Sequence, residues 1–161
     1  MDIELRELKL EDTDKIVKWR NNPLVSSHLL SQKELTREQH IDYFHKYIEN
    51  KLIYQFIIVA DGFDCGTCFL KNINNITKTA EFGIFIGEDS FRGHGIGRIA
   101  AQKTIEFGFE RLDLVLIYLF VFDYNMPAIK SYERIGFKKS QGFVDNRYPN
   151  LIKMDIKKFF I

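Results

Sequence analysis

The sequence predicts an α/β protein built on one mixed sheet with helices on both faces, and three observations lead to this prediction. Strand-like and helix-like segments follow one another in the order βαα-βββ-α-β-α-ββ. The 161 residues suit a single domain, which we place at 1–161, and they contain no Pro/Ser-rich linker and no repeat. A glycine-rich loop at 92–97 joins a strand-like run directly to a helix-like run.

The first third of the chain predicts one strand and two helices. Residues 3–6 alternate in polarity like a strand. Residues 12–19 open on an Asp-Thr pair that can cap a helix, and they carry an apolar stripe. Residues 36–48 open on the capping box Thr-Arg-Glu-Gln and predict a second helix. Pro23 excludes helical geometry from the residue before it. The segment 22–33 between the two helices has no clear periodicity.

The middle of the chain predicts three strands followed by a helix. Strand candidates lie at 54–60, 65–71 and 79–86, and Gly- or Asn-rich turns separate them. The glycine loop follows, and 96–110 has the composition of a helix.

The last third predicts a strand, a helix and two further strands. The apolar run 114–122 is almost unbroken, which predicts a strand covered on both faces. Asn125 can cap the next helix and Gly136 can end it. Strands are then expected near 142–144 and at 151–157.

Composition excludes several classes of function. A net charge of +1 gives no basic field for nucleic acid, and 45% hydrophobic with 28% charged residues is ordinary for a soluble protein. Residues 1–4 lack the basic start of a signal peptide, and no apolar run is long enough to span a bilayer. We therefore expect a cytoplasmic protein with no nucleic-acid or membrane partner.

Cysteine and histidine spacing predicts no metal site. Cys65 and Cys68 lack a second Cys or His pair at zinc-site spacing, so we expect both to be buried strand residues. His40 and His45 are five residues apart on the second helix and hence on different faces.

The glycine loop is the strongest candidate for a binding site. Glycine at alternate positions removes the Cβ, so successive N–H groups can turn toward a diphosphate at the positive end of the following helix. An ordinary strand-to-helix turn would show the same pattern, so a second motif is needed to decide. The loop consists of Arg92, Gly93, His94, Gly95, Ile96 and Gly97.

Two motifs in the chain agree with one family. Arg92, Gly95 and Gly97 match the pattern Arg/Gln-x-x-Gly-x-Gly/Ala. A second pattern, Asn-x-x-Ala-x-x-x-Tyr-x-x-x-Gly-Phe, is matched by Asn125, Ala128, Tyr132, Gly136 and Phe137. In this order, the chain resembles the GNAT superfamily of acetyl-CoA-dependent N-acetyltransferases. A Rossmann fingerprint does not fit, because the third glycine arrives one residue early.

The resemblance implies a GNAT fold with a mostly antiparallel sheet of six to seven strands, in which a central strand pair splays apart to admit acetyl-CoA. Tyr132, a protonated phenol at pH 7, would donate a proton to the departing thiolate. Glu81 would accept protons from the amine through water. Simpler interpretations are a core tyrosine and a solvated edge carboxylate. The implied cofactor contacts are Phe85, Ile86, Arg92, Gly93, His94, Gly95, Ile96, Gly97, Asn125 and Ala128.

The loop after the first helix is predicted to select the acceptor. It offers an aromatic face, a guanidinium with paired N–H donors, an amide and an imidazole, which suit a sugar or a nucleotide diphosphate. A capped helix end with an exposed arginine is the plainer interpretation. Residues 17–50 and the tail resemble the nucleotide-sugar amine acetyltransferases of the pseudaminic acid pathway, and Arg-Asn-x-Pro also occurs in Rim-type N-terminal acetyltransferases. The predicted acceptor contacts are Trp19, Arg20, Asn21 and His28.

Three functions stay open at this point. The first is direct transfer of acetyl, through a tetrahedral intermediate and without an acyl-enzyme, to the 4-amino group of a UDP-linked 4-amino-4,6-dideoxy sugar. The second is acetylation of the α-amino group of a protein or peptide. The third is a non-catalytic acyl-CoA-binding module. The sequence does not fix the oligomeric state, and a homodimer fits it as well as a monomer does.

Overall fold

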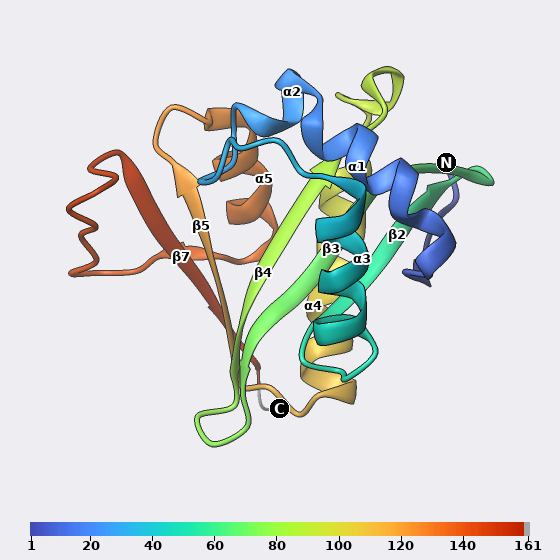
Figure 1. Cartoon of the computed structure of the whole chain (residues 1–161). Helices are drawn as coiled ribbons and strands as arrows, with labels where there is room; N and C mark the ends of the chain where they lie inside the picture. Colours follow the sequence, from blue (N-terminus) through green and yellow to red (C-terminus); the bar gives the residue numbers. More distant parts are fainter. Residues whose placement is uncertain (160–161) are drawn as a thin grey trace.

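A seven-stranded sheet forms the centre of the molecule (Figure 1), and the computed structural model describes residues 1–159. The strands lie in the order β1-β2-β3-β4-β5-β7-β6, and every neighbouring pair is antiparallel except β4 with β5. The predicted mixed, mostly antiparallel sheet is thus confirmed. The strands are β1 (Ile3–Glu7), β2 (Tyr54–Ala60), β3 (Phe63–Asn74), β4 (Thr79–Ile86), β5 (Leu116–Phe122), β6 (Lys138–Lys139) and β7 (Leu151–Lys157).

Helices cover both faces of this sheet (Figure 1). On one face Ile16 and Trp19 of α1 and Phe44 at the end of α3 pack around Ile57 of β2. On the other face α4 and α5 cover the larger apolar core. The helices are α1 (Thr13–Asn21), α2 (Pro23–Ser26), α3 (Arg37–Tyr43), α4 (Ile96–Arg111) and α5 (Met126–Ile135), with a π-helical turn at Phe44–Ile48 and 3-10 turns at Leu10–Asp12 and Asp89–Phe91.

Local sequence signals account for the helix boundaries around residues 22–36. The Thr36 hydroxyl accepts the Gln39 N–H at 3.2 Å, and the Gln39 side chain accepts the Thr36 N–H at 3.0 Å, so the predicted capping box opens α3. Asn22 is extended at φ −65° and ψ 124°, as Pro23 requires. Pro23 then begins α2, a single turn that the sequence did not signal.

The parallel pair at the centre of the sheet is short. β4 and β5 are paired only at 79–81 with 116–118, and above this point they diverge (Figure 1). Beyond Glu81, the facing strand edges therefore do not satisfy each other's backbone N–H and C=O groups. The splayed central pair that the resemblance implied is present.

The prediction that the strand at 114–122 is covered on both faces is wrong. Ile117, Leu119 and Val121 are buried, but Tyr118 and the other even-numbered residues of β5 are only half-buried. In the described chain no helix covers that second face of β5 (Figure 1). On this side Phe120 and Phe122 border a cleft, not a second layer of helices.

The predicted strand at 142–144 is also absent. A two-residue strand, β6, lies earlier, at Lys138–Lys139. The chain then bends at Gly142, where φ is 77°, and at Asp145, whose carboxylate accepts the Arg147 N–H at 2.8 Å. Turns that local side chains stabilise replace the expected ladder.

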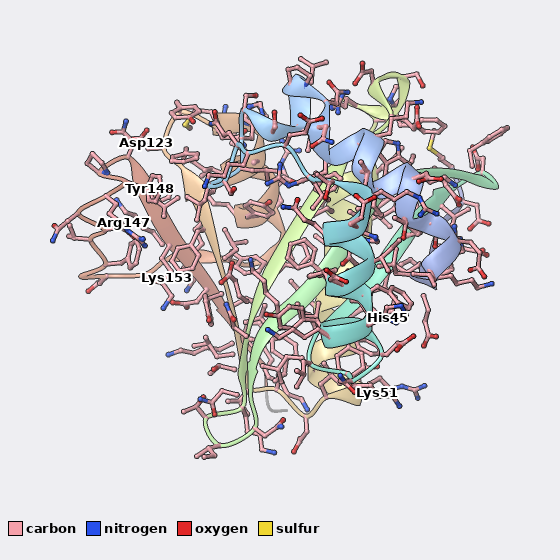
Figure 2. The ribbon with its side chains drawn as sticks, in the orientation of Figure 1. His45, Lys51, Asp123, Arg147, Tyr148 and Lys153 are labelled. Atoms are coloured by element: carbon pink, nitrogen blue, oxygen red, sulfur yellow. The ribbon has the colours of Figure 1, made fainter. Side chains whose placement is uncertain are left out.

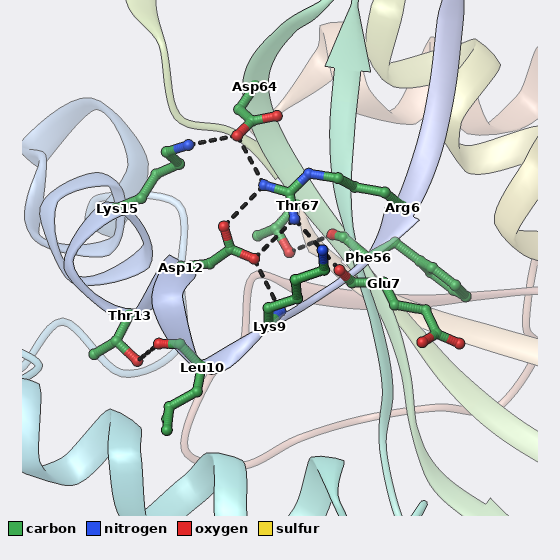
Figure 3. Close-up of polar contacts among 10 residues, drawn as sticks. All are labelled: Arg6, Glu7, Lys9, Leu10, Asp12, Thr13, Lys15, Phe56, Asp64 and Thr67. Carbon is green, nitrogen blue, oxygen red and sulfur yellow. Dashed lines mark hydrogen bonds and ion pairs between the residues drawn. The ribbon is translucent and has the colours of Figure 1, made fainter.

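A charged network ties the N-terminal strand to the first helix and to β3 (Figure 3). Arg6 donates two hydrogen bonds to Asp12, at 2.8 and 2.9 Å, and a third to Asp64 at 2.8 Å. Lys15 also donates to Asp64, and the Lys9 N–H donates to Asp12 at 2.9 Å. Burial alone would raise the pKa of Asp12, but these donors outweigh it and leave the pKa below its usual range.

His40 is buried beneath α1, whereas His45 is exposed, so the two lie on different faces as predicted. The His40 Nδ1 atom lies 2.9 Å from the Thr13 hydroxyl, and its Nε2 is buried without a hydrogen-bond partner among the described residues. Burial lowers the pKa of His40, opposed in part by Asp12. Within residues 1–159 no cluster of His, Cys, Asp and Glu could hold a metal ion.

His40→Asn should remove part of the acid sensitivity of folding. Because the pKa of His40 is lowered in the folded state, the unfolded chain binds this proton first, and stability falls as the pH drops through 6.5. The loss amounts to at most about 1.4 kcal/mol per pH unit. In urea unfolding, the free energy of the wild type should fall relative to that of the variant between pH 7.5 and 5.5. If the difference in unfolding free energy between the wild type and the variant does not change with pH, the lowered pKa of His40 is contradicted.

Candidate active site

A cleft of about 750 Å³ opens where β4 and β5 diverge. Its walls are residues 81–86 of β4 and 119–122 of β5. The glycine loop and the start of α5 border it, and so do Arg20 and the segments 24–25 and 28–31. Segments that are far apart in the sequence therefore meet around one cavity.

The glycine loop has the backbone geometry of an anion site. Gly93 and Gly95 adopt φ values of 78° and 75°, which side chains disfavour. Gly95 is also the N-cap of α4, and no side chain caps this helix, so the N–H groups of its first turn are free for a ligand. Arg92 and Arg98 both line the cleft beside the loop. The diphosphate of coenzyme A fits these groups.

The space beside Gly97 is available to a ligand. A Cβ at this position would come no closer than 4.0 Å to Ile84, so protein packing does not require glycine, yet Gly97 lines the cleft. The Ile96 side chain is buried in the core and His94 is exposed. Neither lines the cleft, which leaves only their backbone groups available to a ligand.

The β4 wall presents backbone as well as side chains. Phe85 and Ile86 line the cleft, and β4 above Glu81 is paired with β3 on one edge only. An extended amide ligand can pair with the other edge as an added strand would. The Ile86 carbonyl already accepts a hydrogen bond from Arg92 Nη2 at 2.6 Å.

Tyr132 reaches the cleft from α5, on the face of the sheet that α4 and α5 cover. Its ring packs edge-on against Phe82, with centroids 6.3 Å apart, and against Phe137 at 5.8 Å. Burial raises the pKa of Tyr132 to about 12, so the phenol is protonated at neutral pH. Among the described residues its hydroxyl has no hydrogen-bond partner. The Tyr132 hydroxyl is thus available to donate its proton to a ligand.

Asn125 and Ala128 border the same part of the cleft. Asn125 stands at the N-cap of α5, but its side chain makes no capping hydrogen bond, so the expected cap is absent. The amide of Asn125 is therefore free to contact a ligand.

Glu81 reaches the cleft from the opposite face of the sheet. It is the last residue of β4 that pairs with β5, and its side chain is 16% exposed. Its carboxylate accepts a hydrogen bond from Asn72 at 3.1 Å and faces Lys71 Nζ at 3.7 Å. The proton donor and the carboxylate thus enter one cavity from two sides.

Of the four residues predicted to contact the acceptor, the structure brings Arg20 and His28 to the cleft. Arg20 Nη2 donates to the Ser31 carbonyl at 2.5 Å, whereas Nη1 is buried with no hydrogen-bond partner in the described chain. Burial lowers the pKa of Arg20. His28 Nδ1 lies 3.2 Å from the Leu24 carbonyl, within α2 and its C-terminal turn.

Trp19 and Asn21 do not contact the cleft, so these two predictions are corrected. The Trp19 side chain is 1% exposed and packs in the core beneath α1. Asn21 donates to the Leu35 carbonyl at 2.8 Å and accepts the Leu35 N–H at 2.7 Å. Both lie on α1, where helical spacing turns them away from Arg20, and both support the loop instead of facing a ligand.

Sequence reasoning missed several residues that line the cleft. Lys71 lies opposite Glu81 in the β3–β4 pairing, and this hairpin register was the signal that could have revealed it. Arg98 lies in the first turn of α4, three residues beyond Gly95. Phe120 and Phe122 follow from the alternation of β5 once one face is known to be open.

The outer rim of the cleft is aromatic. Phe122 stacks on the exposed Tyr124 with centroids 5.2 Å apart, and it meets Tyr148 at 6.3 Å. Tyr148 and Lys153 project beside the uncovered face of β5 and β7 (Figure 2), and Lys153 Nζ lies 4.6 Å from the Tyr118 ring centroid. The open face of the sheet therefore carries aromatic side chains, with the cation of Lys153 beside the Tyr118 ring.

The cysteines are buried, as predicted, and neither lines the cleft. Cys68 accepts a hydrogen bond from the Thr104 hydroxyl at 3.0 Å. Burial raises the pKa of Cys68 to about 12 and that of Cys65 to about 11. Neither thiol can act as a nucleophile in this cavity.

A family model described as "Acetyltransferase (GNAT) domain" matches residues 2–138 of this chain. The chain belongs to the GNAT family. It is therefore an acyltransferase with acetyl-CoA as its donor, and a non-catalytic binding module is set aside. None of the described helices is long and apolar enough to cross a membrane.

GNAT relatives of this chain carry different names. It is 29% identical to spermidine N(1)-acetyltransferase of Escherichia coli K12, over 96% of this chain and 85% of the relative. It is 28% identical to acetyltransferase PseH of Campylobacter jejuni, over 81% and 80%. It is 30% identical to the putative ribosomal N-acetyltransferase YdaF of Bacillus subtilis, over 94% and 80%.

Solved GNAT structures share the fold described here. Spermidine N-acetyltransferase from Vibrio cholerae, in complex with CoA and spermine, superposes with a TM-score of 0.86 at 27% identity. The match covers 96% of this chain and 95% of that one.

Gly97→Ala should weaken donor binding without loss of stability. Alanine favours a helix over glycine by up to about 1 kcal/mol, and the fold has room for the methyl group. We expect the KM for acetyl-CoA to rise at least about tenfold, equivalent to about 1.4 kcal/mol of binding, while the melting temperature stays equal or increases. Calorimetric titration with coenzyme A and a thermal melt measure the two effects. Unchanged coenzyme A affinity would place the ligand elsewhere.

Tyr132→Phe should lower kcat by about 10²- to 10⁴-fold, the usual contribution of a positioned proton donor. The KM for acetyl-CoA should change little, because phenylalanine keeps the ring contacts with Phe82 and Phe137. Thiol release under saturating donor measures kcat. Tyr124→Phe is the matched control, since Tyr124 is exposed at the rim. Full activity in the Tyr132 variant would remove this residue from the proton transfer.

Proposed function

We propose that this enzyme acetylates a primary amine on an acceptor that also carries negative charge. A nucleotide-linked amino sugar fits best, with the 4-amino group of a UDP-4-amino-4,6-dideoxy sugar as the leading candidate. The observation that supports this is the charge of the cleft. In the described chain one carboxylate, Glu81, lines it, against the cationic side chains Arg20, Lys71, Arg92 and Arg98.

The donor diphosphate accounts for Arg92 and Arg98, which lie beside the glycine loop. Lys71 already faces Glu81. Arg20 is therefore the cation left for the acceptor. A buried guanidinium N–H without a partner is costly, and a phosphate oxygen of the acceptor would satisfy Nη1. Phe120 and Phe122 supply the apolar wall that a sugar ring needs.

In the proposed reaction the amine nitrogen bonds to the acetyl carbon while the carbon–sulfur bond of the thioester breaks. The thioester supplies the activated acetyl group. Tyr132 donates its proton to the leaving sulfur, and its raised pKa keeps that proton in place at neutral pH. Glu81 accepts the amine proton through water. Cavity access from two faces of the sheet supports direct transfer, without an acyl-enzyme.

The basicity of the amine also bears on the choice of acceptor. A lysine-like amine of pKa about 10.4 costs about 4.6 kcal/mol to hold neutral at pH 7, whereas an amine near pKa 8 costs about 1.4 kcal/mol. Glu81 already accepts a hydrogen bond and faces a cation, so it can give only modest help. This favours the less basic amine.

Spermidine and a protein N-terminus are the competing acceptors that the relatives' names suggest. A polyamine would bring several positive charges against Arg20 and Lys71, which is unfavourable. An α-amino group suits the modest base as well as an amino sugar does, but it does not by itself supply the anion that Arg20 requires. A homodimer and a cytoplasmic location also stay predictions; one Vibrio cholerae relative is described as dodecameric.

An acceptor panel tests the proposal. At pH 7.5, coenzyme A release is measured with a UDP-linked 4-amino sugar, spermidine and a peptide with a free N-terminus. We expect kcat/KM for the nucleotide sugar to exceed the others by at least about tenfold, equivalent to about 1.4 kcal/mol. A preference for spermidine or for the peptide would overturn the proposal.

Arg20→Gln sharpens the same test. It should raise the KM for the nucleotide sugar at least about tenfold, the scale of one charged hydrogen bond, and leave the KM for acetyl-CoA unchanged. Arg37→Gln is the matched control, because Arg37 is exposed and pairs with Asp14 at 2.9 Å on the surface.

A further inference from the structure

Two side-chain contacts join the end of α1 to the segment that leads from β4 into the glycine loop. Trp19 Nε1 donates to Glu88 at 2.7 Å, and Asn22 Nδ2 donates to Asp89 at 3.1 Å. Both acceptors lie between Ile86, on the donor wall, and Arg92, at the loop entrance. The acceptor side and the donor side of the cleft are therefore in direct contact outside the cavity.

Asp89 lies at the centre of this connection. Its Oδ1 atom accepts hydrogen bonds from both Asn22 and Arg92. Arg92 in turn donates to the Ile86 carbonyl at 2.6 Å and lines the cleft. One carboxylate oxygen thus fixes the loop arginine and contacts the residue that precedes α2.

Asn22 uses the other end of its amide to hold α2. Its Oδ1 accepts the Leu24 N–H at 3.1 Å and caps the helix. Leu24, Val25 and His28, which line the acceptor end of the cleft, follow directly in the chain. A shift of Asn22 therefore moves that wall of the cleft.

The Trp19 contact makes this joint rigid. A Cβ on Gly87 would come within 2.1 Å of Trp19 Cγ, so the indole lies flush against the backbone there. The Gly87 and Glu88 N–H groups also donate to the Cys65 carbonyl, at 2.8 and 3.0 Å. Within this packed frame, the hydrogen bonds of Asp89 to Asn22 and Arg92 are the contacts that a ligand at Arg92 can change.

We propose that Asp89 is a positioning residue that couples donor binding to the acceptor wall. A donor diphosphate competes with Asp89 for the Arg92 guanidinium, because both are anions that accept hydrogen bonds from its N–H groups. As Arg92 turns toward the diphosphate, the Asp89 oxygen is left to Asn22, and the cap of α2 becomes firmer. The coupling is reciprocal, so an acceptor that orders α2 also favours the donor. This inference does not depend on which amine is acetylated.

Hydrogen exchange with coenzyme A as the probe tests the coupling. In the wild type, coenzyme A should slow exchange at least threefold both in the glycine loop and in residues 22–31. In Asp89→Ala, coenzyme A should still bind within about threefold of the wild-type affinity and protect the glycine loop. Protection of 22–31 should then be lost.

Three variants make the result specific. Asn22→Ser can still cap α2 but is too short to reach Asp89, so it should lose the same protection, and the double variant should lose no more than either single one. Ser90→Ala, an exposed neighbour in the same turn, should behave as the wild type does. Emission from Trp19, the single tryptophan, reports whether each variant keeps its packing.

Equal protection of 22–31 in Asp89→Ala and in the wild type would overturn the proposal, as would the absence of such protection in the wild type. Absence of coenzyme A protection at the glycine loop of the wild type would overturn it as well, because the coupling requires the diphosphate to bind Arg92 there. An acceptor other than a nucleotide sugar would contradict the proposed function and leave the coupling intact, so the two failures are distinguishable.

Discussion

The divergence of β4 and β5 is the constraint on which the rest of the structure depends. The strands are paired at only three positions and then separate, so their facing edges lose the ladder that would normally satisfy them. That separation creates the cleft and exposes a strand edge to an extended ligand. It also lets Tyr132 and Glu81 enter one cavity from opposite faces of the sheet. Two substrates can then meet across the sheet.

The donor end gives up stability in exchange for binding. Two glycines with positive φ precede α4, and the N-terminus of this helix has no side-chain cap. Glycine at an N-cap costs about a few tenths of a kcal/mol relative to Ser or Asp, and the φ of 75° at Gly95 adds a backbone conformation that side chains disfavour. A side chain there would compete with the ligand for the same N–H groups. Sacrificed stability of this kind is typical of a functional site.

The acceptor end is held by contacts that are not themselves part of the cavity. Asn21 fixes Leu35, Asn22 caps α2, and Trp19 packs against Gly87. These neighbours of Arg20 support the wall, while Arg20 itself keeps a buried N–H without a partner among the described residues. The acceptor that we propose rests on the charge of that wall and not on the fold, because relatives in this family are named for spermidine as well as for another acceptor.

The sequence by itself determined the family and most of the element boundaries, and it supplied the residues that we propose for the donor site. These are local features: β2, β4 and β7 follow from short apolar runs bounded by turn residues, and the two motifs coincide with the positive φ of Gly95 and with α5. Only the tertiary structure decided which side chains of 16–31 face the cleft, that one face of β5 is open, and that Lys71 neutralises Glu81. Those outcomes depend on which way a helix turns and on which strand lies opposite, and neither is encoded in any short stretch of sequence.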